Sequence, residues 1–285
     1  MVDQVDVEPI MPFGLQVMAR EPGQPIAAAL SPGWLKEQVR RHRLLLLRGF
    51  APLPTAAALE GYCATWGPLK QWSFGAVLEL VEHASPADQV FDSGCVPFHW
   101  DGMYAEQLPA YQVFHCINAL DASAGGQTIF CDGTRIWADA DLETRARWRA
   151  ISITYSLPQK AHYGGQITAP LVCAHPDFGW PVLRFNEPAP AGVRLLNPPS
   201  LRFAGISADA AGAFVEELRA LLYSPRYLYS HAWQTGDTLI ADNYVLLHGR
   251  TAFTSGAPRH LRRVQLLGDP PRAGSDAHRP AYIKE

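Results

Sequence analysis

Hydrophobic residues along the chain follow two periods, one typical of helices and the other of strands. Residues 208–222 carry four large apolar side chains at helical spacing and predict the clearest helix. Residues 44–50 form a short apolar run closed by glycine, which predicts a buried strand. Further helices are predicted at residues 33–43, 55–66 and 139–150.

Strands dominate the rest of the pattern. Runs rich in aromatic and β-branched residues predict strands at 111–117, 127–131, 151–156, 180–186, 226–231, 237–242 and 261–267. The Pro/Gly-rich stretches 157–179 and 187–205 predict loops, and residues 70–95, without a clear pattern, could line the mouth of a site. Many strands with few helices favour a mainly β fold with flanking helices, a double-stranded β-helix or cupin-like jelly roll. With no internal repeat or low-complexity linker, we expect a single domain over residues 1–285, its core at about 90–268.

Composition and charge exclude several classes of protein. The 285 residues are 48% hydrophobic, which suits a globular core, and the formal net charge is −3. No lysine/arginine block of the kind that grips nucleic acid is present, since the run at 40–43 suits the C-terminal end of a helix. The sequence shows neither a signal pattern nor an apolar run long enough to span a membrane. We therefore expect no nucleic-acid or membrane partner, and the sequence leaves open whether the chain forms a homo-oligomer.

Cysteine usage indicates the compartment. The five cysteines are odd in number, widely spaced and without a CxxC pair, namely Cys63, Cys95, Cys116, Cys131 and Cys173. This pattern argues against a disulfide framework or a zinc knuckle. We therefore expect a cytoplasmic protein.

The chemistry centres on a His-x-Asp motif and a distant histidine. His99 and Asp101 are two residues apart, so on a strand both project to one face, with Trp100 pointing away. His248 ends the segment 237–247, strand-like at its start, and is the best candidate for a third ligand. Two imidazoles and one carboxylate on one face of a metal ion form the triad of non-haem Fe(II) oxygenases. The His-x-Asp motif alone also occurs by chance, and the combination with the distal segment carries the hypothesis.

Basic and hydroxyl side chains near the predicted site suggest an acidic cosubstrate. Arg259 and Arg263 follow His248 by eleven and fifteen residues, and a guanidinium beside the metal can hold a carboxylate bidentately. The alternative is a basic strand that faces water. Thr128, after the Gly125-Gly126 turn signal, is either a hydroxyl donor to the site or an ordinary β-branched strand residue.

Together these motifs resemble the taurine dioxygenase-like (TauD/TfdA) family. The matching elements, in family order and spacing, are Phe98-His99-Trp100-Asp101, Gly125-Gly126-Gln127-Thr128, Gly236-Asp237, Asp242-Asn243, His248, Arg259 and Arg263. The resemblance runs from about residue 30 to 268 and implies Fe(II), 2-oxoglutarate and O2 as cofactor and cosubstrates. It implies that His99, Asp101 and His248 bind iron, that Thr128 and Arg259 hold the distal carboxylate of 2-oxoglutarate, and that Arg263 faces the anionic group of the substrate.

A narrower resemblance concerns the substrate. The stretch from His99 to Tyr104, followed by Pro109 and by Phe114-His115-Cys116, is similar to the PvcB-type subgroup, whose members desaturate a tyrosine-derived isonitrile in secondary metabolism. It implies oxidative decarboxylation of an aromatic isonitrile carboxylate to a vinyl isonitrile. Tyr104 would then lie just past the iron ligands and stack on or hydrogen-bond to a phenol, unless it is a rim or core tyrosine.

Three other functions stay open at this point. A hydroxylase of another small carboxylate or sulfonate would use the same site. A non-catalytic jelly-roll binding protein would keep only the metal or none, and a metal-only cupin hydrolase or isomerase would leave Arg259 without a role. The sequence does not decide between an alkene and an alcohol product, because that choice depends on the exact placement of the substrate.

Overall fold

A seven-stranded sheet forms the larger layer of the structure, a computed structural model that describes residues 4–158 and 164–281. In spatial order its strands are β1 (Val5–Pro9), β2 (Leu15–Ala19), β3 (Leu44–Arg48), β14 (Thr238–Asp242), β6 (Gln107–Asn118), β16 (His260–Ala273) and β4 (Val77–Leu80). All neighbours are antiparallel except β2 and β3, which are parallel. The predicted strand at 44–50 is confirmed as β3, whose four leucines are all buried.

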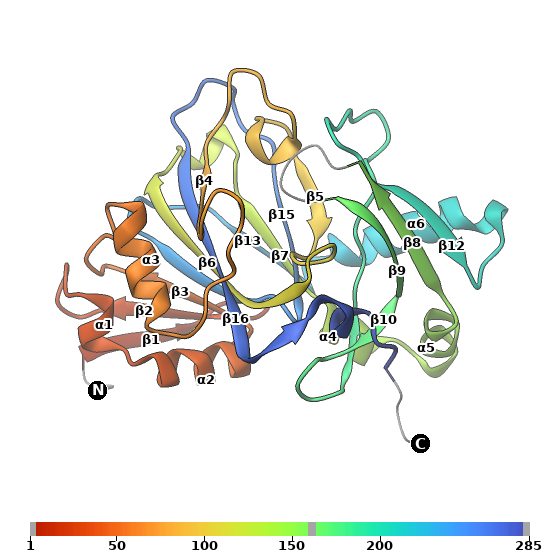
Figure 1. The fold of residues 1–285 in the computed structure, drawn as a ribbon, viewed down its shortest axis with the longest axis horizontal. Helices are drawn as coiled ribbons and strands as arrows, with labels where there is room; N and C mark the ends of the chain where they lie inside the picture. Colours follow the sequence, from red (N-terminus) through yellow and green to blue (C-terminus); the bar gives the residue numbers. More distant parts are fainter. Residues whose placement is uncertain (1–3, 159–163, 282–285) are drawn as a thin grey trace.

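A four-stranded antiparallel sheet packs against this layer (Figure 1). Its strands, in spatial order, are β13 (Leu228–His231), β7 (Thr128–Asp132), β15 (Leu246–Arg250) and β5 (Val96–His99). A buried cluster joins the two sheets; for example, the Phe114 ring of β6 lies 6.3 Å from the Phe130 ring of β7. Two facing antiparallel sheets with an apolar core between them form the predicted jelly roll.

Helices cover the outer face of the seven-stranded sheet. They are α1 (Ile26–Ala29), α2 (Pro32–His42) and α3 (Ala56–Ala64), and a second buried cluster lies between them and the sheet. The Ser31 hydroxyl caps α2 by accepting from the Trp34 N–H, and Leu35 and Val39 face the sheet. Arg40, Arg41 and His42 occupy the last turn, as predicted for cations at a helix C-terminus. The helices predicted at 33–43 and 55–66 are therefore confirmed.

A third sheet extends the fold beside the four-stranded one. It contains β12 (Ser200–Ala204), β8 (Ser152–Leu157) and β9 (Gly165–Pro170), and the short pair β10 (Val172–Ala174) and β11 (Pro181–Leu183) lies nearby. The helices of this region are α4 (Gly133–Asp139), α5 (Leu142–Arg149) and α6 (Ala208–Leu222). The helix at 208–222 is confirmed to the residue, and Phe214, Leu218 and Leu222 are its buried face. The short 3-10 helices are η2 (Gln89–Phe91), η3 (Ala122–Ala124) and η4 (Gly274–His278).

Several predicted elements differ from the structure. The loops predicted at 157–179 and 187–205 contain three strands, β9, β10 and β12. β9 and β12 gave no strand signal because side chains on both of their faces are largely exposed and show no apolar alternation. The helix predicted at 139–150 begins only at Leu142, where the Asp141 carboxylate caps it. The strand predicted at 237–242 is confirmed as β14, and His248 lies on the next strand, β15, in the opposite sheet.

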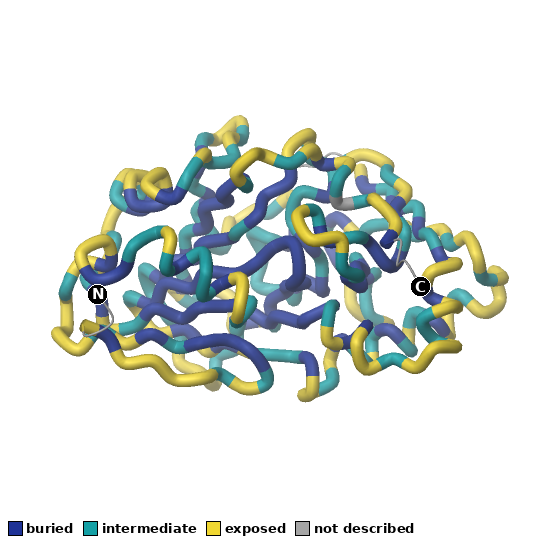
Figure 2. Tube along the Cα trace, turned by 90° about the horizontal axis from the view of Figure 1, so that it is seen from below, coloured by how far each residue is buried: buried dark blue, intermediate teal, exposed yellow. Residues whose placement is uncertain are grey.

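Burial separates the layered core from its rim. Figure 2 shows buried chain running through the middle of the molecule and exposed chain along the outer loops. All five cysteines are free, as the prediction of no disulfide framework required. Among the described residues, no helix combines the length and the apolar character needed to cross a bilayer.

Candidate metal centre and active site

The three predicted metal ligands meet at one end of the four-stranded sheet. His99, the last residue of β5, pairs in register with His248 on β15, and their rings lie 4.2 Å apart. The Asp101 Oδ1 atom lies 3.7 Å from His99 Nε2. One potential ligand atom from each of the three residues lies within 4.8 Å of the others, which is close enough to hold one ion. Residues separated by about 150 positions therefore converge as predicted.

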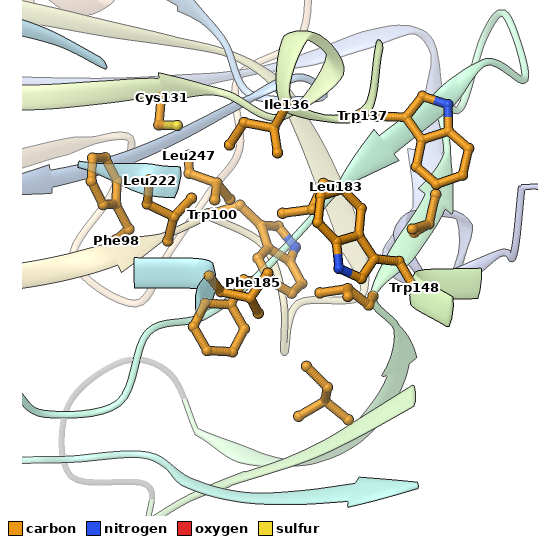
Figure 3. Close-up of a cluster of buried hydrophobic side chains, with 14 of the residues drawn as sticks. Phe98, Trp100, Cys131, Ile136, Trp137, Trp148, Leu183, Phe185, Leu222 and Leu247 are labelled. Atoms are coloured by element: carbon orange, nitrogen blue, oxygen red, sulfur yellow. The ribbon is translucent and has the colours of Figure 1, made fainter. Parts of the chain in front are cut away.

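The predicted reason for this convergence is partly wrong. β5 ends at His99, so Asp101 does not share a strand face with it but lies in the following turn. Gly102 takes a φ of +91° there, and a Cβ atom at this position would lie 2.5 Å from Pro109 Cδ, so only glycine fits the turn. Trp100 does point away, into a buried cluster that includes Phe185 and Leu183 (Figure 3). Its ring also meets the Tyr155 ring edge-on at 5.9 Å.

The protonation of two ligands already suits metal binding. Burial by itself would raise the pKa of Asp101, but its interactions with Arg263, the two histidines and Gln265 outweigh burial and lower the pKa to about 2. Burial, reinforced by His99, lowers the pKa of His248 well below its usual value. At neutral pH the site therefore presents an ionised carboxylate and a neutral imidazole, the forms in which both groups bind metals.

The two oxygens of Asp101 have different partners. Oδ1 faces His99, whereas Oδ2 accepts from Gln265 Nε2 and pairs with Arg263 Nη1 at 2.6 Å. Arg263, predicted to face the anionic group of a substrate, is thus engaged by Asp101 while its side chain also lines the cavity beside the triad. Because Oδ2 is held in this way, Oδ1 is the atom left on the side of the imidazoles.

Sequence reasoning missed the residues that brace the triad. Asn243 Oδ1 accepts from the Asp101 N–H at 3.2 Å and from Gln112 Nε2 at 2.8 Å, while Asn243 Nδ2 donates to the carbonyls of Asp101 and Pro109. Gln112 Nε2 also lies 3.5 Å from His248 Nδ1. The only signal for Asn243 was its place in the distal motif, and Gln112 looked like an ordinary strand residue.

A pocket beside the triad brings together the predicted 2-oxoglutarate residues. His99, His248, Thr128 and Arg259 all line it. Arg259 immediately precedes β16 and is buried, with its Nε donating to the Gly126 carbonyl at 3.2 Å. Burial, reinforced by a neighbouring arginine, lowers the pKa of Arg259 to about 9, and the described part of the chain offers it no carboxylate partner. A buried guanidinium without an anion is the expected state of a carboxylate site.

Neighbouring residues explain the shape of this pocket. Trp233 Nε1 donates to Thr128 Oγ1 at 2.9 Å, which leaves the hydroxyl proton of Thr128 available to a ligand. A Cβ atom on Gly125 would lie 2.1 Å from the Ala252 carbonyl oxygen, and one on Gly126 would lie 3.0 Å from Arg259 Nε. The Gly-Gly turn is therefore required for the close approach of the arginine. The alternative of a solvated basic strand is excluded for Arg259, since it is 7% exposed.

A larger cavity of about 910 Å³, including its open mouth, adjoins the triad from the other side. It shares His99 and Arg263 with the first pocket, so the three ligands lie where two cavities meet. Its wall includes Trp72, from the segment 70–95 that was expected to line the mouth of a site, and Tyr104. The Tyr104 hydroxyl is buried without a partner, and burial raises its pKa to about 12. Tyr104 thus lines the cavity and also packs against a buried hydrophobic cluster, and its contact with a substrate stays a prediction.

Comparisons with known proteins agree with this geometry. The model of the family described as taurine catabolism dioxygenase TauD, TfdA family matches residues 6–265. The chain is 42% identical over 264 residues to the 3-((Z)-2-isocyanoethenyl)-1H-indole synthase of Fischerella ambigua, covering 93% of this chain and 96% of that protein. It is 43% identical over 259 residues to the tyrosine isonitrile desaturase of Pseudomonas aeruginosa, covering 90% and 88%.

A solved structure is similar over nearly the whole length. The crystal structure of PvcB from Pseudomonas aeruginosa superposes with a TM-score of 0.81 at 38% identity, covering 96% of this chain and 95% of that one. Another structure of PvcB is described as that of an Fe, alpha-ketoglutarate-dependent oxygenase from an isonitrile synthetic pathway. This similarity confirms the predicted fold class.

Proposed function

We propose that this chain, which belongs to the TauD, TfdA family of dioxygenases, converts a tyrosine-derived isonitrile into a vinyl isonitrile by oxidative decarboxylation. The chain is an Fe(II)- and 2-oxoglutarate-dependent oxidoreductase that uses O2 and acts on a small molecule. The relatives that match at 42% and 43% identity, an isocyanoethenyl-indole synthase and a tyrosine isonitrile desaturase by name, support an aromatic isonitrile, and the second supports the tyrosine derivative. The reaction belongs to secondary metabolism.

The donor set fits ferrous iron. We assign His99, Asp101 and His248 as its ligands, because two imidazoles and one carboxylate on one side of an ion leave the other positions open. When bound, ferrous iron with O2 and 2-oxoglutarate supplies the oxidising power that removes a hydrogen atom from the substrate. The buried Arg259 fits the same assignment, since it lacks an anion beside the triad.

The chain's own residues position the two organic acids. Arg259 and Thr128 hold the far carboxylate of 2-oxoglutarate in the smaller pocket, by a charge-assisted pair and a hydroxyl hydrogen bond. Arg263 and Gln265 hold Asp101 Oδ2 and so keep that oxygen away from the face shared with the imidazoles. We assign Arg263 also as the cation for the substrate carboxylate, because its side chain lines both cavities. Tyr104 contacts the aromatic ring.

The proposed reaction balances without a further reagent. The substrate loses one hydrogen from the carbon beside the ring and its carboxylate leaves as CO2, which forms the carbon–carbon double bond. 2-Oxoglutarate becomes succinate and a second CO2. One oxygen atom of O2 enters succinate and the other, with the substrate hydrogen and a proton, leaves as water. The protein contributes placement of the reacting groups and exclusion of water.

A single incubation tests this function. Enzyme, Fe(II), 2-oxoglutarate and tyrosine isonitrile are mixed without oxygen, and oxygen is then admitted. We expect succinate and vinyl isonitrile in equal amounts. Succinate without vinyl isonitrile across a panel of aromatic isonitriles would instead favour a hydroxylase of another small anionic substrate. The absence of any absorption band when 2-oxoglutarate is added to the Fe(II) protein would indicate a non-catalytic binding protein.

Other features of the protein stay predictions. These are a single dioxygenase domain over residues 1–285 and a cytoplasmic location supported by five free cysteines, while the possibility of a homo-oligomer stays open. Size-exclusion chromatography with light scattering measures the oligomeric state directly.

A further inference from the structure

The wall of the larger cavity includes an irregular segment that contributes every second residue to the lining. Leu195, Asn197 and Pro199 line the cavity, whereas the residues between them do not. Burial follows the same alternation along this segment. Asn197 therefore borders the cavity, while its two sequence neighbours do not. Asn197 is 0% exposed to solvent and is thus at the closed part of the wall.

Hydrogen bonds fix the orientation of the Asn197 amide. Its backbone N–H donates to Gln89 Oε1 at 3.1 Å, and its carbonyl accepts from Gln89 Nε2 at 3.3 Å. Its Nδ2 donates to Asp88 Oδ2 at 3.1 Å. A carboxylate oxygen accepts only, so Nδ2 must face Asp88 and Oδ1 must face the other way. Oδ1 is buried and has no hydrogen-bond partner in the structure.

The other polar groups on this part of the wall are already satisfied. Gln89 uses both amide atoms on the backbone of Asn197. Glu187 Oε1 accepts from Arg219 Nε at 2.7 Å, and its Oε2 accepts from the Phe98 N–H and the Tyr223 hydroxyl. An acceptor that stays unpaired in a buried position is unfavourable, so we expect such an atom beside a cavity to accept a hydrogen bond from a ligand.

We propose that Asn197 determines substrate specificity by accepting a hydrogen bond from the phenolic hydroxyl of the substrate. This inference rests on the proposed function, in which the substrate is an aromatic isonitrile carboxylate. The carboxylate and the two carbons that become the alkene must lie at the triad and Arg263, so the ring extends away from them into the cavity. The para hydroxyl is then the most distant group of the substrate. Oδ1 of Asn197 can only accept, and it therefore selects a ring that carries a donor.

Tyr104, the other unpartnered polar side chain considered for this contact, fits a different role. It follows Asp101 by only three residues and lies on the turn beside the triad, where the substrate ring begins. Its hydroxyl can donate as well as accept, so it imposes no requirement for a donor on the ligand. Tyr104 therefore packs on the substrate ring, and Asn197 accepts a hydrogen bond from the para hydroxyl of that ring.

Binding measurements with three ligands test the proposal. The ligands are the isonitriles derived from tyrosine, 4-fluorophenylalanine and phenylalanine, and the protein carries Mn(II) and 2-oxoglutarate so that no turnover occurs. Fluorine has nearly the size of a hydroxyl but donates no hydrogen bond. We expect calorimetry to show that the wild-type protein binds the tyrosine compound at least about tenfold more tightly than the other two. In Asn197→Leu, an apolar replacement of similar volume, we expect the three dissociation constants to agree within about threefold.

Tyr104→Phe is the matched control. It removes the buried, unpartnered hydroxyl of Tyr104, and we expect weaker binding of all three ligands with the preference for the tyrosine compound retained. Loss of that preference in Tyr104→Phe and its survival in Asn197→Leu would overturn the proposal. So would equal wild-type affinity for the tyrosine and 4-fluoro compounds, a result that decides the matter even if Asn197→Leu fails to fold.

Failure of this inference is distinguishable from failure of the proposed function. If wild-type protein with Fe(II) and O2 makes vinyl isonitrile but shows no donor preference, only the role of Asn197 is wrong. If it binds none of the three compounds and makes no vinyl isonitrile, the function is wrong and the role of Asn197 falls with it.

Discussion

Replacing Arg259 with leucine is expected to change 2-oxoglutarate binding and folding stability in opposite directions. The guanidinium is 7% exposed, its Nε has one hydrogen bond to the Gly126 carbonyl, and it packs 5.6 Å from the Phe253 ring. Loss of one partner from a buried charge pair costs roughly 2–5 kcal/mol. The dissociation constant for 2-oxoglutarate in Arg259→Leu should therefore rise about 30- to 5000-fold.

Folding stability of the metal-free protein without cosubstrate should instead increase when Arg259 is replaced by leucine. Burial lowers the pKa of Arg259 to about 9, which means that the native state disfavours its charge. A lowered pKa of a basic group destabilises the native state fully below pH 9, and the penalty is relieved as pH rises from 9 toward the usual value for arginine. After allowance for the Gly126 and Phe253 contacts, we expect Arg259→Leu to raise the free energy of unfolding by about 1–3 kcal/mol at pH 7.

Two measurements and one control decide the argument. Anaerobic titration of 2-oxoglutarate into the Fe(II) protein gives the dissociation constant, and urea unfolding of the metal-free protein gives the stability. Arg262→Leu is the matched control, because Arg262 is on the other face of β16 and pairs with Glu79 at 2.8 Å. It should change the 2-oxoglutarate affinity by less than about twofold. An unchanged dissociation constant in Arg259→Leu would refute the assignment of Arg259 to the cosubstrate carboxylate.

Three further substitutions test residues that surround the metal ligands and the 2-oxoglutarate pocket or are buried elsewhere in the core. Gln265→Leu removes a donor to Asp101 Oδ2 and should weaken Mn(II) binding about 10- to 100-fold by calorimetry, with unchanged affinity as the contrary result. Gly126→Ala places a side chain at a φ of +77° and 3.0 Å from Arg259 Nε, so stability should fall by about 1–2 kcal/mol and 2-oxoglutarate affinity should fall with it. Burial raises the pKa of Asp242 to about 7, so the destabilisation of the native state by its ionised carboxylate grows as pH rises from 4 to 7. In urea unfolding, Asp242→Asn should therefore raise the free energy of unfolding by roughly 2–4 kcal/mol at pH 8 and change it little at pH 4.

Sequence patterns predicted the elements that bury a wide apolar face. The helix at 208–222 and the strand from Leu44 were found correctly because each turns large side chains toward a core on a regular period. β9 and β12 were missed because they flank β8 as edge strands and expose most of their side chains. Their proline- and glycine-rich surroundings then indicated loops. Stability of these strands comes from pairing with β8, a tertiary contact that no local window contains.

The residues of the candidate site also fall into a group that the sequence predicts and a group that it does not. The triad was predictable because ligand chemistry restricts residue types and two of the ligands are neighbours in sequence. The bracing residues were not, since Gln265 contacts Asp101 across 164 positions and Asn243 does so across 142. Those contacts depend on the register of β16 and on the turn after β14, and a shift of one residue would point the side chains elsewhere. Glutamine and asparagine carry no sequence signature of such a role.

Charge balance explains why the site holds two buried arginines. Under the proposed function, Asp101 is ionised, 2-oxoglutarate brings two negative charges, and the substrate carboxylate brings one more, which makes four. Ferrous iron contributes two positive charges, and Arg259 and Arg263 contribute one each, while His248 is neutral. With metal, cosubstrate and an anionic substrate all bound as proposed, these charges sum to zero. In the protein without ligands Asp101 and Arg263 neutralise each other at 2.6 Å, whereas Arg259 has no anion among the residues that the structure describes. This asymmetry favours binding of 2-oxoglutarate before the substrate, since its carboxylate meets a free cation and the substrate must share one with Asp101.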